Sequence, residues 1–141
     1  MIENNILGVI LAGGRSSRFG SNKADACLGN KTLLEHTIEK VEKNFLEILI
    51  VSNKENIKIN KKNVFLVKDY IKGQLGPLIG ILSAMKWVEQ NNNKYKWIAS
   101  FPCDTPFFDG SIIEKLKNCS ILDDHLLFFL NSGKKRHNIF G

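Results

Sequence analysis

A single α/β domain, with a doubly wound, mostly parallel sheet and helices on both of its faces, is the fold class that this 141-residue sequence predicts. Short apolar runs rich in β-branched residues alternate with longer amphipathic runs, which is the pattern of parallel strands joined by crossover helices. The length suits one hydrophobic core, and no internal repeat or linker-like segment divides the chain. We therefore expect residues 1–141 to form one domain with right-handed crossovers.

Short apolar runs mark the expected strands. The first of them ends in a glycine-rich segment and contains no charged residue, as is typical of a strand that is buried on both faces. The complete set of expected strands is residues 6–11, 48–51, 64–67, 97–101 and 126–130.

Three amphipathic segments are expected to be helices. Thr32 can cap the first, which runs to about residue 44, Pro77 begins the second, and Asp109 caps the third. The apolar residues expected to face the core are Leu34, Ile38, Val41 and Phe45 in the first helix, Leu78, Ile81, Leu82, Met85 and Val88 in the second, and Ile112, Ile113 and Leu116 in the third.

The composition is that of a soluble protein. No apolar run reaches the length of a membrane span and no signal-peptide pattern begins the chain, so we expect a cytoplasmic protein without a membrane partner. The net charge of +6 comes mostly from scattered lysines, which together with frequent Asn and Ile indicate an A+T-rich genome and no nucleic-acid partner. Three cysteines lack metal-binding or redox spacing and are expected to be reduced thiols: Cys27, Cys103 and Cys119.

A glycine-rich loop follows the first expected strand. Gly13 and Gly14 allow the backbone to approach a ligand closely, and free amides in such a loop form a cradle for phosphate oxygens. The spacing fits neither the Walker A motif nor the dinucleotide-binding fingerprint. Cationic side chains that can flank a bound phosphate chain follow in the loop: Arg15, Arg18 and Lys23. We interpret the segment as a phosphate-binding loop.

Two carboxylates follow other expected strands. Asp69 comes after the third strand, and Asp104 comes after the fourth, held between Pro102 and Pro106. Ligands bind outside the carboxyl ends of strands in open α/β sheets, so we expect both to lie at the edge that carries the glycine loop. Mg²⁺ takes one or two carboxylates with phosphate oxygens and water, which Asp104 could supply. A loop-capping role for Asp104 and a turn role for Asp69 are the structural alternatives.

Four segments resemble motifs of one family. Residues 11–20, LAGGRSSRFG, together with Lys23 resemble the LAGGxSxRMGxxK signature of the MobA-like nucleotidyltransferases. Residues 76–83, GPLIGILS, and 102–107, PCDTPF, are similar to later motifs of the molybdenum cofactor guanylyltransferases within that family, and residues 136–141 resemble part of a terminal motif. The chain departs from the family pattern at Asn22, Thr32 and Asn138.

The resemblance implies a fold of the nucleotide-diphospho-sugar transferase type and Mg²⁺-dependent transfer of GMP from GTP to molybdopterin cofactor, with release of pyrophosphate. It implies catalytic roles for Arg18, Lys23 and Asp104, with Asp104 as the metal ligand. The nucleotide-binding residues that it implies are Leu11, Ala12, Gly13, Gly14, Lys23, Asn53, Asp69 and Asp104, with the register between Ser52 and Asn53 left open. Its implied partners are GTP, the cofactor and other cofactor-biosynthesis proteins.

Members of that family continue beyond the motifs present in this sequence. We therefore expect a domain that lacks its C-terminal portion, with unpaired strand edges and exposed apolar surface. Two alternatives stand beside an active guanylyltransferase: a GTP-binding fragment impaired in catalysis, and a related cytidylyltransferase that uses CTP.

Overall fold

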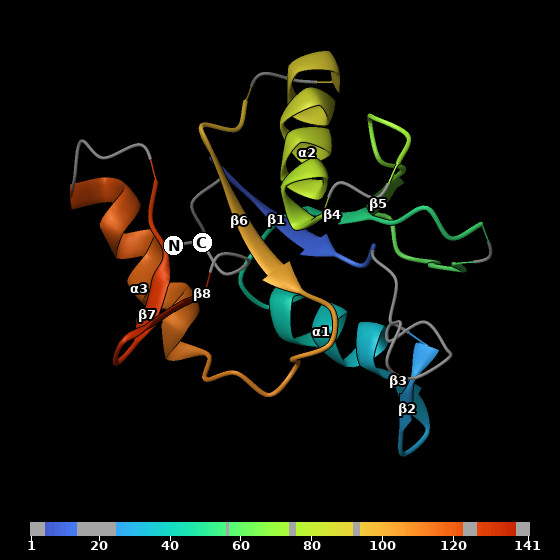
Figure 1. Cartoon of the computed structure of the whole chain (residues 1–141), viewed down its shortest axis with the longest axis horizontal. Helices are drawn as coiled ribbons and strands as arrows, with labels where there is room; N and C mark the ends of the chain where they lie inside the picture. Colours follow the sequence, from blue (N-terminus) through green and yellow to red (C-terminus); the bar gives the residue numbers. More distant parts are fainter. Residues whose placement is uncertain are drawn as a thin grey trace.

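A four-stranded parallel sheet forms the centre of the molecule (Figure 1). The structure is a computed structural model that describes residues 5–13, 25–55, 57–73, 76–91, 94–122 and 127–137. The strand order is β5-β4-β1-β6, with every neighbouring pair parallel. These strands are β1 (Ile6–Leu11), β4 (Ile48–Val51), β5 (Val64–Val67) and β6 (Trp97–Pro102). Four of the five strands expected from the sequence are thus confirmed, and β6 extends one residue further than expected.

Helices cover both faces of the sheet, as the doubly wound prediction requires (Figure 1). Ile6 and Ile10 of β1 belong to the core on the side of α1 and α3, whereas Leu7 and Val9 belong to the core on the side of α2. This alternation follows from the two-residue repeat of a strand, and it explains why β1 is apolar without interruption. The helices are α1 (Leu33–Glu42), α2 (Pro77–Asn91) and α3 (Ser111–Leu122).

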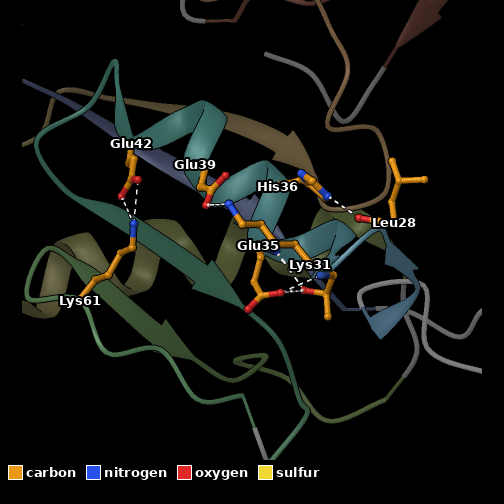
Figure 2. Close-up of polar contacts among 8 residues, drawn as sticks. Leu28, Lys31, Glu35, His36, Glu39, Glu42 and Lys61 are labelled. Carbon is orange, nitrogen blue, oxygen red and sulfur yellow. Dashed lines mark hydrogen bonds and ion pairs between the residues drawn. The ribbon is translucent and has the colours of Figure 1, made fainter.

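Helix α1 begins at the cap that its sequence predicts. The hydroxyl of Thr32 accepts a hydrogen bond from the backbone N–H of Glu35, and the Glu35 carboxylate accepts one from the Thr32 N–H, which completes a capping box. The helix ends two residues earlier than expected, with Lys43 as its C-cap. Figure 2 shows the polar contacts along its exposed side: His36 with the carbonyl oxygen of Leu28, Lys31 with Glu39, and Lys61 with Glu42.

Helix α2 corrects the predicted core face. Leu78 and Met85 were expected to point inward, yet they are 69% and 57% exposed. Val88 is buried as expected, but the rest of the buried stripe consists of Gly80, Ser83 and Ala84. Its small residues let the helix approach the sheet closely, and this contact outweighs the hydrophobicity of the longer side chains.

The fifth expected strand is also corrected. Within the described part of residues 126–130, only Leu130 is in a strand, and it begins β7 (Leu130–Ser132), which pairs antiparallel with β8 (Lys135–His137) away from the parallel sheet. Gly133 has a φ of 61° in the turn between them, which glycine adopts without steric strain. A second small hairpin, β2 (Cys27–Leu28) with β3 (Lys31–Thr32), precedes α1.

Helix α3 packs Ile113 into the core, fully buried, while Ile112 and Leu116 are half-buried. The side chain of Asp109 accepts a hydrogen bond from the Ser111 N–H at the helix start, in agreement with the expected capping role. A cavity of about 350 Å³ lies between α2, α3 and β6, among residues such as Met85, Val88, Trp97, Ile113 and Leu127. It lies toward the amino ends of β1 and β6, away from the loops that carry the candidate site.

Candidate functional site

The four parallel strands end at one level, which places four loops side by side. Leu11 pairs with Val51 and with Pro102, and Val51 pairs with Val67. Backbone hydrogen bonds extend the pairing by one residue, with N–O distances of 2.9 Å from Ala12 to Val51, 2.9 Å from Ser52 to Val67 and 3.2 Å from Cys103 to Leu11. The segments that follow the strands therefore start from a common, well-supported edge.

Gly13, Asn53 and Asp69 form a cluster at this edge. The side-chain amide of Asn53 donates to Asp69 Oδ2 over 2.6 Å, and Asn53 Oδ1 accepts the backbone N–H of Asp69 over 2.9 Å. A Cβ at Gly13 would lie 3.9 Å from Asp69 Oδ2, so the glycine backbone sits directly beside the carboxylate. The three residues come from loops far apart in sequence, and the order β5-β4-β1 brings them together.

The structure distinguishes Asn53 from Ser52. Ser52 is buried, and its hydroxyl donates to the carbonyl oxygen of Ala12 and accepts the N–H of Lys54. Asn53 is exposed and directs its side chain toward Asp69. Ser52 thus joins the ends of β1 and β4 in the interior, whereas the Asn53 side chain lies at the exposed edge.

Asp104 lies at the same edge but on the other side of β1, just beyond the end of β6. Three strand spacings separate β6 from β5, so the two strands that precede Asp104 and Asp69 lie roughly 14 Å apart. The preceding Cys103 is buried in the core. Its carbonyl oxygen accepts a 3.1 Å hydrogen bond from Thr37 of α1, which ties the Asp104 loop to the helix below.

Other predicted site residues lie outside the described residues, namely Gly14, Arg18 and Lys23. At the far end of that loop, the carboxylate of Asp25 pairs with the ammonium of Lys54, one residue beyond Asn53. The sequence reasoning did not single out this ion pair. Lys54 adjoins a predicted site residue, but no local pattern connects it with a partner 29 residues away.

In the loop between β6 and α3, a hydrogen bond to the backbone stabilises the charge of one carboxylate. The N–H of Ser111 stabilises the charged form of Asp109, and this lowers the pKa of that carboxyl from its usual value. Within the described part of the chain, no three His, Cys, Asp or Glu side chains are grouped to hold a metal ion by themselves.

Comparison with known proteins gives consistent matches. The model of the MobA-like NTP transferase domain matches residues 8–140. The molybdenum cofactor guanylyltransferase of Sinorhizobium fredii is 33% identical over 132 residues, which are 94% of this chain and 60% of that protein. The protein of the same name from Haemophilus influenzae is 32% identical over 136 residues, or 96% of this chain and 68% of that protein. The chain thus spans about 60–68% of the length of these curated relatives.

The fold also has a close counterpart among solved structures. Molybdopterin-guanine dinucleotide biosynthesis protein A from Archaeoglobus fulgidus superposes with a TM-score of 0.72 at 20% identity. The match covers 95% of this chain and 65% of that one, and it confirms the mostly parallel sheet with helices on both faces. No helix in the described ranges combines the length and the apolar character that a bilayer crossing requires.

Proposed function

The chain belongs to the MobA-like NTP transferase domain family, and from this premise we propose that it transfers GMP from GTP to molybdopterin cofactor with release of pyrophosphate. The observation that carries the proposal is the common edge at which Gly13, Asn53 and Asp69 cluster, with Asp104 across β1 on the same edge. The proposed identities of the transferred group, guanylyl, and of its acceptor, the cofactor, come from the names of the relatives.

Asn53 and Asp69 form the nucleoside side of the proposed site. Their mutual hydrogen bonds hold an amide and a carboxylate in a defined orientation before any ligand arrives. A preorganised donor and acceptor lose little conformational freedom on binding, and this favours affinity and selectivity for one base. Leu11, Ala12 and Gly13 supply backbone next to this pair, and the absence of a side chain at Gly13 leaves room beside Asp69.

The other side of the site receives the phosphates. In our proposal, amides of the glycine loop, including that of Gly14, together with Arg18 and Lys23 neutralise the negative charge of the triphosphate. Asp104 holds a divalent cation, which we propose to be Mg²⁺, together with phosphate oxygens and water. The half-buried carboxylate at a strand end fits this chemistry, because Mg²⁺ uses few protein ligands at phosphate sites. The bound cation supplies charge neutralisation for the phosphate oxygens.

The reaction that follows is an in-line displacement at phosphorus. A phosphate oxygen of the acceptor attacks the α-phosphorus of GTP and forms a new P–O bond. The bond from the α-phosphorus to the oxygen that bridges to the β-phosphorus breaks, and pyrophosphate leaves with that electron pair. No covalent intermediate with the protein is needed, so the residues of the site act by positioning and by charge.

The experiment that tests the proposal is Asp104→Ala in an assay of pyrophosphate release from GTP and molybdopterin cofactor with Mg²⁺. We expect turnover to be lost while the far-UV circular dichroism spectrum is retained. Asp109→Ala is the matched control, because it removes a nearby carboxylate that caps α3 and has no proposed contact with the ligand. Full activity of the Asp104 variant would refute the assignment.

Thermal shift measurements test the nucleotide directly and do not depend on the acceptor. We expect GTP with Mg²⁺ to raise the melting temperature more than CTP or ATP does, because a ligand stabilises the state that binds it. A larger shift with CTP would redirect the proposal to a cytidylyltransferase. No shift with any of the three nucleotides would refute a nucleotide site, whereas a GTP shift without turnover would indicate a binding fragment.

A further inference from the structure

Ser83 connects helix α2 to the loop that carries Asp69. The Ser83 hydroxyl donates to the carbonyl oxygen of Ile79 over 2.7 Å and accepts the backbone N–H of Tyr70 over 2.8 Å. The side chain is only 2% exposed, so these two contacts use its single donor and an acceptor site away from water. Ser83 lies in the buried stripe of α2, although the sequence pattern did not assign it to the core face of this helix.

Two successive backbone amides of this loop are thus held from different elements. The N–H of Asp69 donates to Asn53, which follows β4, and the N–H of Tyr70 donates to Ser83 of α2. Together the two bonds fix the peptide on either side of the Asp69 side chain. A second link between α2 and the loop, Lys86 Nζ 5.8 Å above the Tyr70 ring, involves exposed groups and is expected to add little.

The approach of α2 to the sheet makes the contact possible. Gly80, one turn before Ser83, packs so closely that a Cβ there would lie 2.7 Å from Leu11 Cδ2. The same close packing that excludes a side chain at Gly80 brings the Ser83 hydroxyl within reach of Tyr70. The buried stripe of small residues in α2 therefore reaches the strand-end edge through Ser83, which binds the backbone of the residue that follows Asp69.

We propose that Ser83 is a positioning residue for nucleotide selection, which orients Asp69 toward Asn53 and Gly13 by holding the Tyr70 amide. The inference rests on the proposed function, in which Asn53 and Asp69 receive the nucleoside. Ser83 does not touch the nucleotide, and it acts through Asp69 alone. Removal of its hydroxyl releases the loop from α2 and lets the carboxylate leave its partner.

The test uses the full 141-residue chain and two probes, GTP with Mg²⁺ and inorganic tripolyphosphate with Mg²⁺, in calorimetric titrations. We expect Ser83→Ala to raise the dissociation constant for GTP by roughly five- to tenfold, which is the change that the loss of one hydrogen bond produces. Tripolyphosphate binding is expected to stay unchanged, because the phosphate side of the site does not depend on Asp69. Val88→Ala, which truncates another buried side chain of α2, should lower the melting temperature without changing either affinity.

A double variant separates positioning from a general loss of stability. If Ser83 acts through Asp69, Ser83→Ala should have no further effect on GTP affinity in an Asp69→Ala background. Additive effects of the two substitutions would overturn the inference. If Asp69→Ala weakens GTP binding but Ser83→Ala does not, the positioning role of Ser83 is overturned while the proposed function stays intact. An unchanged affinity in Asp69→Ala would overturn both.

Amide hydrogen exchange provides a readout that needs no nucleotide. We expect Ser83→Ala to accelerate exchange at Tyr70, whose N–H loses its acceptor, and also at Asp69, whose bond to Asn53 depends on the loop position. Val88→Ala is expected to leave the relative protection of these two amides unchanged. Retained protection of the Asp69 amide in Ser83→Ala would overturn the positioning role, whether or not the chain binds GTP.

Discussion

Helix α2 approaches the sheet closely at Gly80, and Gly80→Ala tests this contact. The added Cβ would lie 2.7 Å from Leu11 Cδ2, about 1 Å short of an ordinary carbon–carbon contact. Leu11 is 8% exposed and cannot simply turn into solvent, so the overpacking should destabilise the fold by about 1–3 kcal/mol. Alanine is better than glycine inside a helix by roughly 0.5–1 kcal/mol, which offsets part of this loss.

The net expectation for Gly80→Ala is a destabilisation of up to about 2.5 kcal/mol, or a fall in melting temperature of up to roughly 8 °C for a chain of this size. Urea denaturation followed by circular dichroism measures it. Gly110→Ala is the matched control, because no atom lies within 4 Å of the position its Cβ would take, and its stability should change by less than about 0.5 kcal/mol.

A second substitution identifies the contact responsible. Leu11→Val removes the Cδ2 atom that the new methyl group would strike, so Gly80→Ala should become neutral or stabilising in that background. Either of two results would refute the reasoning: a more stable Gly80→Ala variant in the natural background, or the same loss of stability in both backgrounds. Each would mean that α2 does not rest on Leu11 as closely as the structure has it.

Two further substitutions test how α1 supports the site. Thr32→Ala removes the capping box and should lower the free energy of unfolding by about 1 kcal/mol in urea titrations at neutral pH. The Thr32 N–H, which the variant keeps, and the Thr32 hydroxyl, which it loses, both lower the pKa of Glu35. The part of the contribution that comes from the hydroxyl's bond to the Glu35 carboxylate is present above about pH 4.5 and is lost as the pH falls through the lowered pKa. A difference between variant and natural protein that does not shrink as the pH falls to about 3 would contradict the assignment. Thr37→Val keeps the shape of a fully buried side chain but removes the hydroxyl, whose single proton is shared between the carbonyl oxygens of Leu33 at 2.8 Å and Cys103 at 3.1 Å. The substitution should lower the stability by about 1–3 kcal/mol. A loss below about 0.5 kcal/mol in the same titration would show that the hydroxyl does not anchor the loop that follows β6.

Much of the fold could be read from local patterns. The runs at β1, β4, β5 and β6 are apolar and bounded by polar or glycine-rich segments, so their identity as strands followed from composition. Composition did not show that β5 is a half-buried edge strand, with Leu66 44% exposed. Thr32 and Asp109 were predictable as capping residues because a cap depends on residues only two or three positions away. The strand expected over residues 126–130 was misplaced and the hairpin of β7 and β8 was not predicted, since these strands are too short for a clear alternation.

The face of α2 could not be read in this way. Hydrophobic periodicity favours large apolar side chains, and it assigned Leu78 and Met85 to the core. The structure buries Gly80 and Ser83 instead, because the free energy of a close helix–sheet contact depends on shape as well as on hydrophobicity. The functional consequence, a serine that holds the Asp69 loop, was hidden for the same reason.

By itself, the sequence determined which residues follow the ends of buried strands, and therefore which loops could carry Asn53, Asp69 and Asp104. Only the tertiary structure decided which of those loops are neighbours. The order β5-β4-β1-β6 joins Asn53 to Asp69 by two hydrogen bonds and sets Asp104 apart on the far side of β1. Strand order depends on pairing between segments that are far apart in the sequence, and no local pattern of residues reports it. The arrangement of the candidate site is therefore defined only in the assembled sheet.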